Sequence, residues 1–491
     1  MTRTKLDISP DGEAVTILID NQWRAAAGGG AVAVHAPSDD GAFAQIARGG
    51  AAEVDEAVAA ARHAFEEGEW GRLTAIERGR LLMRVGELIQ ANAEELAQLE
   101  SRDTGKPLSQ GRADMVAAAR YFEYYGSAAD KVHGETIPFL DGYTVMALRE
   151  PFGVTGHIIP WNYPAQMFGR SLAPSLAMGN ATVLKPAEEA CLLPLRIADL
   201  AIEAGFPPGA INVVTGLGEE AGAPLASHPD IDFLAFTGSP EVGTLVQQAA
   251  ARNHVGCVLE LGGKSPQIVF DDADFDAVLP VVQKAIVQNA GQTCSAGSRV
   301  LVQESVFDAF IERLTAAFGE LVTASHDADA NCGPLVSRAQ QQRVQRMLAD
   351  AEADGVPVIA RGRIAEGTPE QGYYVAPTLL GPVPREHTIA REEVFGPVLC
   401  AIPFRDEADA VALANGTDYG LVAGIWTRDG ARQMRMARRV RAGQVFVNGY
   451  GAGGGIELPF GGMKKSGHGR EKGFEALREF SVVKTVVLNH G

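Results

Sequence analysis

Cysteine is scarce in this sequence, with five residues among 491, at positions 191, 257, 294, 332 and 400. The cysteines are odd in number and widely separated, and no two of them form a Cys-x-x-Cys pair. No histidine lies at metal-ligand spacing from any of them. A disulfide framework and a structural zinc site are therefore not indicated, and we expect no metal centre.

The sequence has fewer basic than acidic residues. It contains 43 Lys and Arg and 61 Asp and Glu, which give a formal net charge of -18 at pH 7. The sequence offers no basic stripe that would neutralise a nucleic-acid backbone. No apolar run approaches the ~20 residues that span a bilayer, and the first ten residues contain no apolar core of signal-peptide length. We expect no nucleic-acid partner, no membrane partner and a cytoplasmic location.

Strands and helices are expected to alternate regularly between residues 153 and 262. The strands are expected at 154–159, 182–185, 211–215, 233–236 and 257–261, and helical stretches separate them. This spacing is typical of a parallel, doubly wound sheet, whose ligands bind at the carboxyl ends of its strands. A second α/β block follows, with strands expected near 267–270, 300–303, 398–402 and 445–448.

Two β segments lie apart from these blocks. Residues 132–148 are expected to form a β-hairpin that turns at Asp141-Gly142, and residues 481–488 form another β-rich piece. Isolated strand edges of this kind invite pairing with a second chain. We therefore predict a homo-oligomer, either a homodimer or a homotetramer.

These blocks define the expected organisation of an α/β protein. A Rossmann-like domain with a doubly wound parallel sheet, residues 1–130 and 149–259, is expected to bind a nucleotide. A second α/β domain, residues 260–478, is the expected catalytic domain, and the active site is expected in the cleft between the two. Residues 131–148 and 479–491 are the expected oligomerisation segment, a small β-hairpin with a terminal strand.

The stretch 287–299, which surrounds Cys294, is rich in small and amide side chains. No bulky sequence neighbour covers the sulfur of Cys294, so a reactive thiol there would be accessible to a substrate. A buried structural cysteine is the commoner interpretation of a lone cysteine. The motifs around it must decide between the two.

Two polar motifs follow the ends of expected strands. Asn162, in Pro160-Trp-Asn-Tyr-Pro164, carries an amide that could donate to a developing oxyanion, and a simple turn residue is the alternative. Lys185 and Glu188 place a cation and a carboxylate where they suit the hydroxyls of an adenosine ribose. A surface ion pair is the commoner explanation of that spacing.

The segment from Phe236 to Gly243 combines a strand end, a glycine turn and a helix start, so its amides and Ser239 could bind a diphosphate. Gly216–Ala221 matches a dinucleotide fingerprint in part, but it has Ala at the third glycine position and two acids, so we interpret it as a chance match. Glu260 ends an apolar strand, where burial would raise its pKa toward that of a general base. A carboxylate that caps the following glycine turn is the alternative.

Taken in order and at their spacing, these motifs resemble the aldehyde dehydrogenase superfamily over essentially the whole chain. The matching segments are Pro160-Trp-Asn-Tyr-Pro164, Lys185-Pro-Ala-Glu188, Phe236-Thr-Gly-Ser239, Glu260-Leu-Gly-Gly-Lys264, Gly291-Gln-Thr-Cys294, Glu393-Val-Phe-Gly-Pro397 and Pro459-Phe-Gly-Gly462. The resemblance implies oxidation of an aldehyde to a carboxylic acid with NAD, through a cysteine thiohemiacetal and a thioester.

The resemblance also implies a role for each matching position. Cys294 corresponds to the nucleophile, Asn162 to the oxyanion donor and Glu260 to the general base, and Glu471 lies at a position behind that base. The implied cofactor residues are Trp161, Lys185, Glu188, Phe236, Gly238, Ser239, Glu393 and Phe395. A carboxylate at position 188 would repel the 2'-phosphate of NADP, so NAD is the expected cofactor.

Activation of the thiol is left open by the sequence. An unperturbed thiol is mostly protonated at neutral pH, and a charged Glu260 close to Cys294 would oppose its ionisation. Either Glu260 turns away during attack or it accepts the thiol proton.

The substrate is constrained by a few positions only. Arg170 is expected on the helix that lines the entrance, where succinic semialdehyde dehydrogenases of the family carry Arg and many other members carry Trp. Gln288 stands where those enzymes carry a second Arg. An uncharged aliphatic or aromatic aldehyde is expected, and a semialdehyde is the alternative. Transfer to coenzyme A is a further alternative, against which Glu260 argues. The expected pocket contacts are Tyr163, Met167, Phe168, Ile456 and the wall 448–458.

Overall fold

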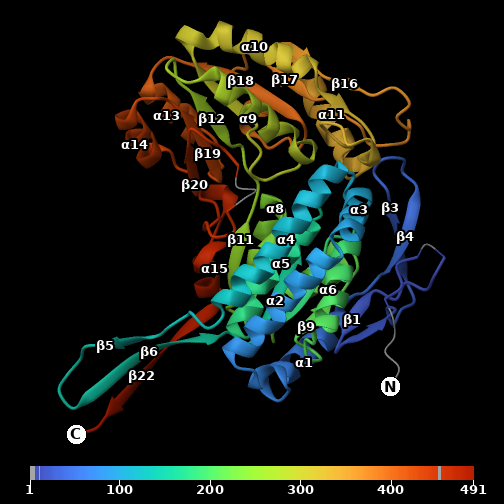
Figure 1. Cartoon of the computed structure of the whole chain (residues 1–491), viewed down its shortest axis with the longest axis vertical. Coiled ribbons are helices and arrows are strands. Elements are labelled where there is room, and N and C mark those ends of the chain that lie inside the picture. The colour runs from blue at the N-terminus through green and yellow to red at the C-terminus, as the bar shows by residue number, and fades with distance from the viewer. Residues whose placement is uncertain (1–5, 10, 452–454) are drawn as a thin grey trace.

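The computed structural model describes residues 6–9, 11–451 and 455–491. Two α/β lobes lie one above the other in Figure 1, and a narrow β arm projects from the lower lobe. The lower lobe contains an eight-stranded sheet and the upper lobe a seven-stranded sheet. The two sheets confirm the predicted α/β class.

The eight-stranded sheet has the order β2-β1-β9-β8-β7-β10-β11-β21. Its five central strands, from β9 to β11, are parallel, which confirms the predicted doubly wound sheet. Strands β1 and β21 run antiparallel to their neighbours at the two sides. The bounds are β1 Ile17–Ile19, β2 Gln22–Arg24, β7 Val154–Ile159, β8 Ala181–Pro186, β9 Ile211–Val213, β10 Phe233–Thr237, β11 Gly256–Glu260 and β21 Gly467–His468.

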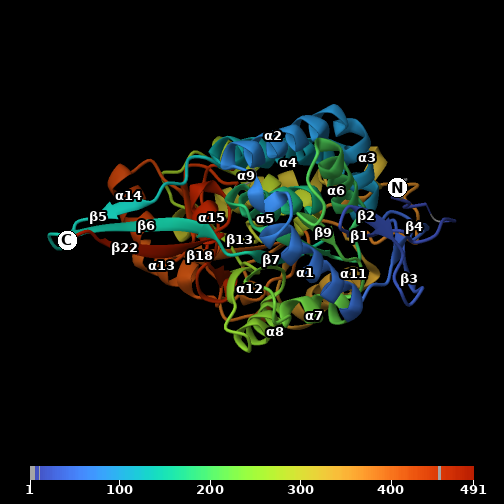
Figure 2. The same cartoon turned by 90° about the horizontal axis from the view of Figure 1, so that it is seen from below.

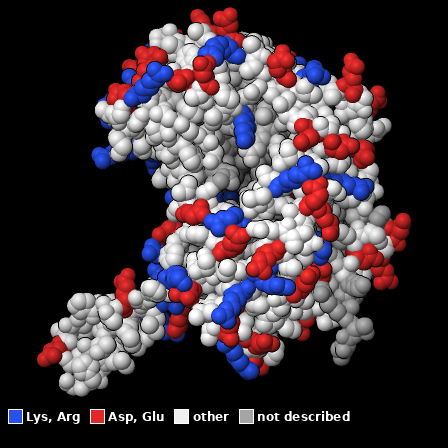
Figure 3. Space-filling model, in the orientation of Figure 1, with Lys and Arg blue, Asp and Glu red and all other residues white. Residues whose placement is uncertain are grey.

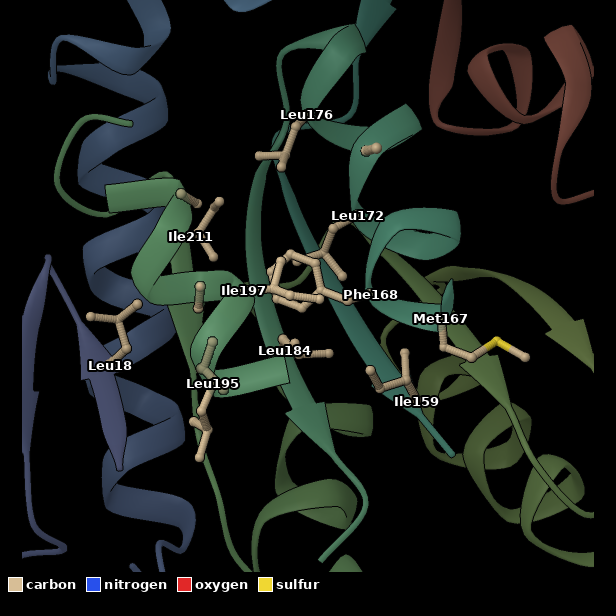
Figure 4. Packing of buried hydrophobic residues seen from close by; sticks show 14 of the residues in the cluster. Leu18, Ile159, Met167, Phe168, Leu172, Leu176, Leu184, Leu195, Ile197 and Ile211 are labelled. Carbon is tan, nitrogen blue, oxygen red and sulfur yellow. The ribbon is translucent and has the colours of Figure 1, made fainter. Parts of the chain in front are cut away.

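Helices cover this sheet because each presents an apolar side to it. In Figure 4 the side chains of Phe168 and Leu172 from α5 lie beside Leu184 of β8 and Ile197 of α6, and all four are fully buried. The helices of this lobe are α1 Ala51–Glu66, α2 Ala75–Ala91, α3 Ala93–Thr104, α4 Leu108–Ala128, α5 Pro164–Met178, α6 Leu192–Ala204, α7 Ala223–Ala226 and α8 Pro240–Ala251. Helices α5 and α8 both begin with proline at the first helical position, which suits its fixed φ.

The seven-stranded sheet has the order β15-β17-β18-β13-β12-β19-β20, and every strand except β15 is parallel to its neighbours. The sequence predicted β12, β13, β18 and β20, but not the other three. The bounds are β12 Pro266–Val269, β13 Arg299–Gln303, β15 Val358–Arg361, β17 Thr378–Leu380, β18 Val398–Phe404, β19 Val422–Trp426 and β20 Gln444–Val447. Its helices are α9 Phe275–Val287, α10 Phe307–Gly319, α11 Arg338–Ala353, α13 Glu407–Asn415 and α14 Gly430–Arg439.

The smaller elements connect these layers. They are β3 Ala31–His35, β4 Ala42–Ala47, β14 Val322–Thr323, β16 Arg363–Ile364, α12 Thr388–Arg391 and α15 Gly473–Glu479. Short helical turns lie at Trp70–Arg72, Gly218–Gly222, Gln288–Gly291, Glu304–Val306, His326–Ala328 and Lys464–Ser466. Among the helices that the structure describes, none has both the length and the apolar run that crossing a membrane requires.

The arm is a three-stranded antiparallel sheet with the order β22-β6-β5. Its strands are β5 Glu135–Ile137, β6 Tyr143–Pro151 and β22 Ser481–Asn489, and Figures 1 and 2 show that it extends away from both lobes. The predicted hairpin is present, but its connection covers residues 138–142, longer than a two-residue turn at Asp141-Gly142. Proline at position 138 has no backbone N–H for the ladder, which accounts for the early end of β5.

The chain crosses between the lobes more than once. After the seven-stranded sheet it returns through β21, which pairs with β11, and through α15, whose Ala476 and Leu477 belong to the core of the first lobe. This return lies inside the 260–478 range expected for the second domain. The domain bounds derived from the sequence stay a prediction.

Candidate active site

Three segments of backbone meet around Cys294. The turn that follows β11 runs directly against it, because a Cβ on Gly263 would lie 2.3 Å from the carbonyl oxygen of Cys294. On the other side, a Cβ on Gly291 would lie 2.1 Å from the carbonyl oxygen of Gly396. Both positions therefore require glycine. The close approach joins the β11 turn, the Cys294 loop and the 393–397 segment into one unit.

The Cys294 loop connects α9 to β13, and the Cys294 side chain is half-buried. Asn289 and Ala290 have φ values of 49° and 52°, in the left-handed region that residues with a Cβ rarely adopt. This strained turn ends α9 and leads the chain back to Cys294. The apolar residues that cluster around Cys294 are Leu421, Val422, Phe446, Tyr450 and Phe460.

Charged side chains surround the sulfur. Burial raises the pKa of the Cys294 thiol, and the carboxylates of Glu260 and Glu393 raise it as well, whereas the Arg170 guanidinium lowers it. All three charged groups are thus within electrostatic range of Cys294. The thiol is protonated at neutral pH in this arrangement.

Asn162 follows β7 and is fixed beside the Cys294 loop. Its Nδ2 donates to the carbonyl of Gln292 at 3.0 Å, two residues before Cys294. The backbone carbonyl of Asn162 accepts hydrogen bonds from Asn289 Nδ2 at 2.8 Å and from Lys106 Nζ at 3.1 Å. The side-chain nitrogen of Asn162 carries two hydrogens, and the Gln292 carbonyl accepts only one of them.

A buried ion cluster supports the turn that contains Asn162. The Lys106 ammonium lies 2.5 Å from carboxylate oxygens of both Glu100 and Asp114, and its side chain is 0% exposed. It also lies 4.3 Å from the centre of the Tyr163 ring, and the Tyr163 hydroxyl is 2.8 Å from Thr293 Oγ1. The cluster therefore braces the β7 turn and, through Tyr163, the residue before Cys294.

Glu260 ends β11 and is 1% exposed. Its Oε2 accepts a hydrogen bond of 2.5 Å from Arg170 Nη2 on α5. Arg170 also forms an ion pair with Glu471 through Nε, and its guanidinium lies 4.5 Å from the centre of the Phe460 ring. Burial raises the pKa of Glu260 to about 8; Arg170 lowers it and Glu471 raises it. The elevated pKa expected from the position of Glu260 is present.

Two of the expected nucleotide motifs lie at the carboxyl ends of β8 and β10, the parallel strands on either side of β7. After β8, Lys185 Nζ donates to Glu188 Oε2 at 2.5 Å, and the Glu188 side chain is 27% exposed. After β10, Ser239 caps α8 by accepting from the N–H of Val242 at 3.3 Å. Phe236 is buried, and a Cβ on Gly238 would lie 2.5 Å from its ring. The Phe236 ring thus packs beneath the turn at Gly238.

A third group lies at the 393–397 segment. Glu393 Oε1 accepts from the N–H of Gly263 at 2.8 Å, and burial raises the pKa of Glu393 to about 7. Phe395 has a φ of 58°, unusual for an aromatic residue, and its carbonyl accepts from Gln340 Nε2 at 2.7 Å. The Phe395 ring meets the Trp161 ring edge-on, with centroids 5.4 Å apart. The strained backbone at Phe395 therefore holds an aromatic pair over this side of the site.

Comparison with known proteins identifies the family. The sequence model of the aldehyde dehydrogenase family matches residues 23–486. The chain belongs to the aldehyde dehydrogenase family. Human retinal dehydrogenase 2 is 40% identical over 476 residues, which are 96% of this chain and 91% of that protein.

Solved structures agree. One of a Burkholderia cenocepacia protein described as an aldehyde dehydrogenase is 61% identical with a TM-score of 0.96, covering 97% of this chain and 100% of the other. Betaine aldehyde dehydrogenase of Staphylococcus aureus, solved with NAD+, is 35% identical with a TM-score of 0.95, covering 97% and 95%. This chain is an NAD-dependent aldehyde dehydrogenase that oxidises an aldehyde to a carboxylic acid.

The side chains of this dehydrogenase fit NAD. A diphosphate needs a helix N-terminus, and α8 begins at a serine with its first-turn amides. Ribose hydroxyls need acceptors and donors that are held in place, and the Lys185–Glu188 pair and Glu393 supply both. The described residues contain no group of three or more His, Cys, Asp or Glu that could hold a metal ion.

The structure of the dehydrogenase changes two expectations about the substrate pocket. Arg170 is 6% exposed and paired with two carboxylates, so it does not line an entrance. Phe168 lies in the core of the first lobe (Figure 4) and is 0% exposed, so it is not a pocket residue. Residues 452–454 of the predicted wall lie outside the described residues. Within that wall, Tyr450 Oη donates to the carbonyl of Ser295 at 2.7 Å.

The sequence did not reveal the residues that support the dehydrogenase site. Lys106 lies in Asp103-Thr-Gly-Lys-Pro107, which reads as a turn with an exposed cation, and its burial depends on partners from two helices. Gln292 Oε1 accepts a hydrogen bond from the N–H of Val336 at 2.9 Å. The position of Gln292, two residues before Cys294, is the sequence feature that could have indicated its supporting role. The chance match 216–221 is a helical turn whose Glu220 pairs with Arg48.

Proposed function

We propose that Cys294 is the nucleophile of this aldehyde dehydrogenase, that Asn162 is the oxyanion donor and that Glu260 is the general base. The observation that carries this assignment is the tie between Asn162 Nδ2 and the Gln292 carbonyl, which fixes the amide beside the loop of Cys294. The second amide hydrogen of Asn162 is then available to a substrate oxygen.

In the first half of the reaction, the Cys294 thiolate adds to the aldehyde carbonyl and forms a tetrahedral adduct. Asn162 stabilises the negative charge that develops on the substrate oxygen. The thiol must lose its proton first, and Glu260, with a pKa of about 8, can accept it at mildly alkaline pH, where the carboxylate is ionised. Bound NAD supplies the acceptor for the hydride, and the enzyme is left as a thioester.

In the second half, Glu260 first releases the thiol proton to solvent and then takes a proton from a water molecule, which attacks the thioester carbonyl. The C–S bond breaks, the acid leaves, and the sulfur recovers a proton. Glu260 is ionised in its catalytic form, so the hydrolytic rate should rise with pH through about 8.

The cofactor residues form three groups in this proposal. Lys185 and Glu188 bind the hydroxyls of the adenosine ribose, and Ser239 with the α8 amides binds the diphosphate. Glu393 binds the nicotinamide ribose, with Phe395 and Trp161 beside the nicotinamide. Gly238 permits close approach of the backbone, and Phe236 supports that turn from below. The partly exposed carboxylate of Glu188 favours NAD over NADP, because a 2'-phosphate would be repelled.

We propose an uncharged aldehyde with an apolar group as substrate. The surroundings of Cys294 are apolar, since Leu421, Phe446, Tyr450 and Phe460 cluster with it. Arg170, the cation on α5 that acts on Cys294, is already paired with two protein carboxylates. It is therefore not available to the carboxylate of a semialdehyde substrate.

We propose that the arm pairs with a second copy of the chain. Its outer strand β22 has one unpaired edge, and Figure 3 shows few charges on the visible face of the arm. The exposed apolar residues of the arm are Ile137, Phe139, Leu140, Tyr143, Val482, Val483, Val487 and Leu488. Surfaces of this kind are usually covered. Whether two or four copies assemble, and the cytoplasmic location, stay predictions.

The test separates the two halves of the reaction. Wild type, Cys294→Ala and Glu260→Gln are mixed with NAD and hexanal, and reduced nicotinamide and acid are followed in a single turnover. Cys294→Ala should form neither product. Glu260→Gln should form reduced nicotinamide once per site at high pH and release acid about 10²–10⁴-fold more slowly. Turnover by Cys294→Ala, or normal acid release by Glu260→Gln, would refute the assignment.

A further inference from the structure

Arg170 sits between two buried carboxylates that come from different parts of the chain. It lies on α5 in the first lobe, and its side chain is 7% exposed. Nη2 donates to Glu260 Oε2 at the end of β11, and Nε faces Glu471 Oε2 just before α15. The Glu260 and Glu471 side chains are 1% and 3% exposed. One guanidinium therefore lies between two buried acidic side chains.

This contact engages only half of the Glu260 carboxylate. Oε2 accepts from Arg170, whereas Oε1 is buried and has no hydrogen-bond partner within the part of the chain that the structure describes. A guanidinium is planar and stacked here on the Phe460 ring, so its direction is fixed. The carboxylate is thus held by one oxygen and leaves the other to accept a proton.

We infer that Arg170 is a positioning residue for the hydrolytic step: it holds one carboxylate oxygen of Glu260 and leaves the other oxygen to act as base. The inference rests on the proposed role of Glu260. It also assigns a task to Glu471, which anchors the far side of the guanidinium.

The electrostatic sign of this arrangement follows from the groups around Glu260. The charged or titratable groups that act on it are Arg170 from α5, Cys294 from its loop, and Arg470, Glu471 and Lys472 from the segment before α15. Arg170 and Arg470 lower the pKa of Glu260, and burial and Glu471 raise it. Removal of the Arg170 cation must therefore raise the pKa of Glu260, and removal of the Glu471 charge must lower it.

A different role for Arg170 makes a different prediction. If Arg170 bound the carboxylate of an anionic aldehyde, its loss would raise KM for that substrate and leave an uncharged aldehyde unaffected. A substrate carboxylate would then be a third acidic group around the Arg170 guanidinium in a buried site, which the desolvation of ions disfavours.

The experiment compares Arg170→Met, Arg170→Lys and Glu471→Gln with wild type. Hexanal and succinic semialdehyde are the probes, with NAD at saturation. The rate of acid formation in a single turnover is measured between pH 5.5 and 9.5, after the reduced nicotinamide has formed. Arg78→Met is the matched control, because Arg78 is a largely buried arginine whose side chain donates to backbone carbonyls of Leu73 and Ala177.

We expect the rising limb of the pH profile to shift to higher pH by about one pH unit or more in Arg170→Met. At pH values below the limb, hydrolysis should then be roughly tenfold slower than in wild type. The shift should be the same for both aldehydes. Arg170→Lys should restore part of it, because the charge is kept. Glu471→Gln should move the limb to lower pH, and it supplies the test if the Arg170 variants do not fold. Arg78→Met should leave the limb in place.

An unmoved limb in Arg170→Met, or in Glu471→Gln where only that variant folds, overturns the inference. A rise in KM confined to succinic semialdehyde, with an unmoved limb, assigns Arg170 to the substrate instead. Glu260→Gln distinguishes a wrong assignment of the base from a wrong role for Arg170. If it hydrolyses the thioester at the normal rate, the proposed base is wrong and the inference falls with it; if it is slow, the base stands and the Arg170 variants decide alone.

Discussion

Replacement of Lys106 by Met should destabilise the protein strongly. Lys106 is 0% exposed and lies 2.5 Å from oxygens of Glu100 and Asp114, whose side chains are 0% and 6% exposed. Burial lowers the pKa of Lys106, but the two carboxylates more than offset this, so Lys106 is protonated at neutral pH. Methionine fills a similar volume without charge. The variant keeps two buried carboxylates and loses their only ammonium contact.

The expected cost is about 3–5 kcal/mol at pH 8, the range for breaking a buried pair from one side. The cost should be smaller at pH 5. Without Lys106 the carboxylates have folded-state pKa values raised above the unfolded ones, so they bind protons on folding. Stability from that binding is present at low pH and is lost as the pH rises. Burial already raises the pKa of Glu100 well above its usual range in the wild type.

The assay is equilibrium unfolding in urea at pH 5 and pH 8, followed by tryptophan fluorescence. A triple variant, Lys106→Met with Glu100→Gln and Asp114→Asn, should recover part of the loss because no uncompensated carboxylate remains. Lys465→Met, which removes an exposed ion pair with Asp418, is the control and should change little. A Lys106→Met protein as stable as wild type at pH 8, or equally destabilised at both pH values, would contradict this account.

Three further outcomes are expected. Glu188→Gln should raise kcat/KM with NADP relative to NAD, and an unchanged ratio would count against repulsion by Glu188. In wild type, KM for NAD should rise as the pH falls below about 7, because Glu393 is then protonated and is a weaker hydrogen-bond acceptor. Glu393→Gln should have a higher KM for NAD that does not depend on pH in this range. A pH dependence that persists in Glu393→Gln would implicate another group. Sedimentation velocity should give a multiple of 51.8 kDa for wild type and a smaller assembly for Val483→Glu, in the exposed part of β22; a wild type of one chain's mass would refute pairing through the arm.

The eight-stranded sheet could be predicted well because its pattern is local. Apolar strands such as β7 and β10 end in turns that contain Gly or Pro, and helical stretches separate them, so sequence spacing alone indicates a parallel sheet. Strands β17 and β19 were not predicted, because short strands buried on both sides show no alternation. The length of the loop before β6 depended on Pro138, which lacks the backbone N–H that would continue the ladder.

The candidate site could be predicted at the level of residues but not of contacts. Asn162 and Glu260 were found because they follow strand ends, where a sheet gathers its polar groups. Lys106 was not found, because its burial depends on carboxylates from α3 and α4 that no local pattern connects to it. Arg170 was predicted on the correct helix, but it was expected to line the entrance and is instead buried between two carboxylates. Its partners Glu260 and Glu471 are 90 or more residues away along the chain, so no local pattern indicates them.

Arg170 also bears on the conflict between the proposed nucleophile, Cys294, and the proposed base, Glu260. A carboxylate near Cys294 opposes formation of the thiolate, and Glu260 does raise the pKa of that thiol. The same guanidinium that holds Glu260 lowers the pKa of Cys294, so one buried cation acts on both groups in the direction that each reaction half needs. A neutral residue at position 170 would leave Glu260 protonated to higher pH and remove the cation that favours the thiolate. In the proposed mechanism the two steps are therefore coupled through the side chain of Arg170.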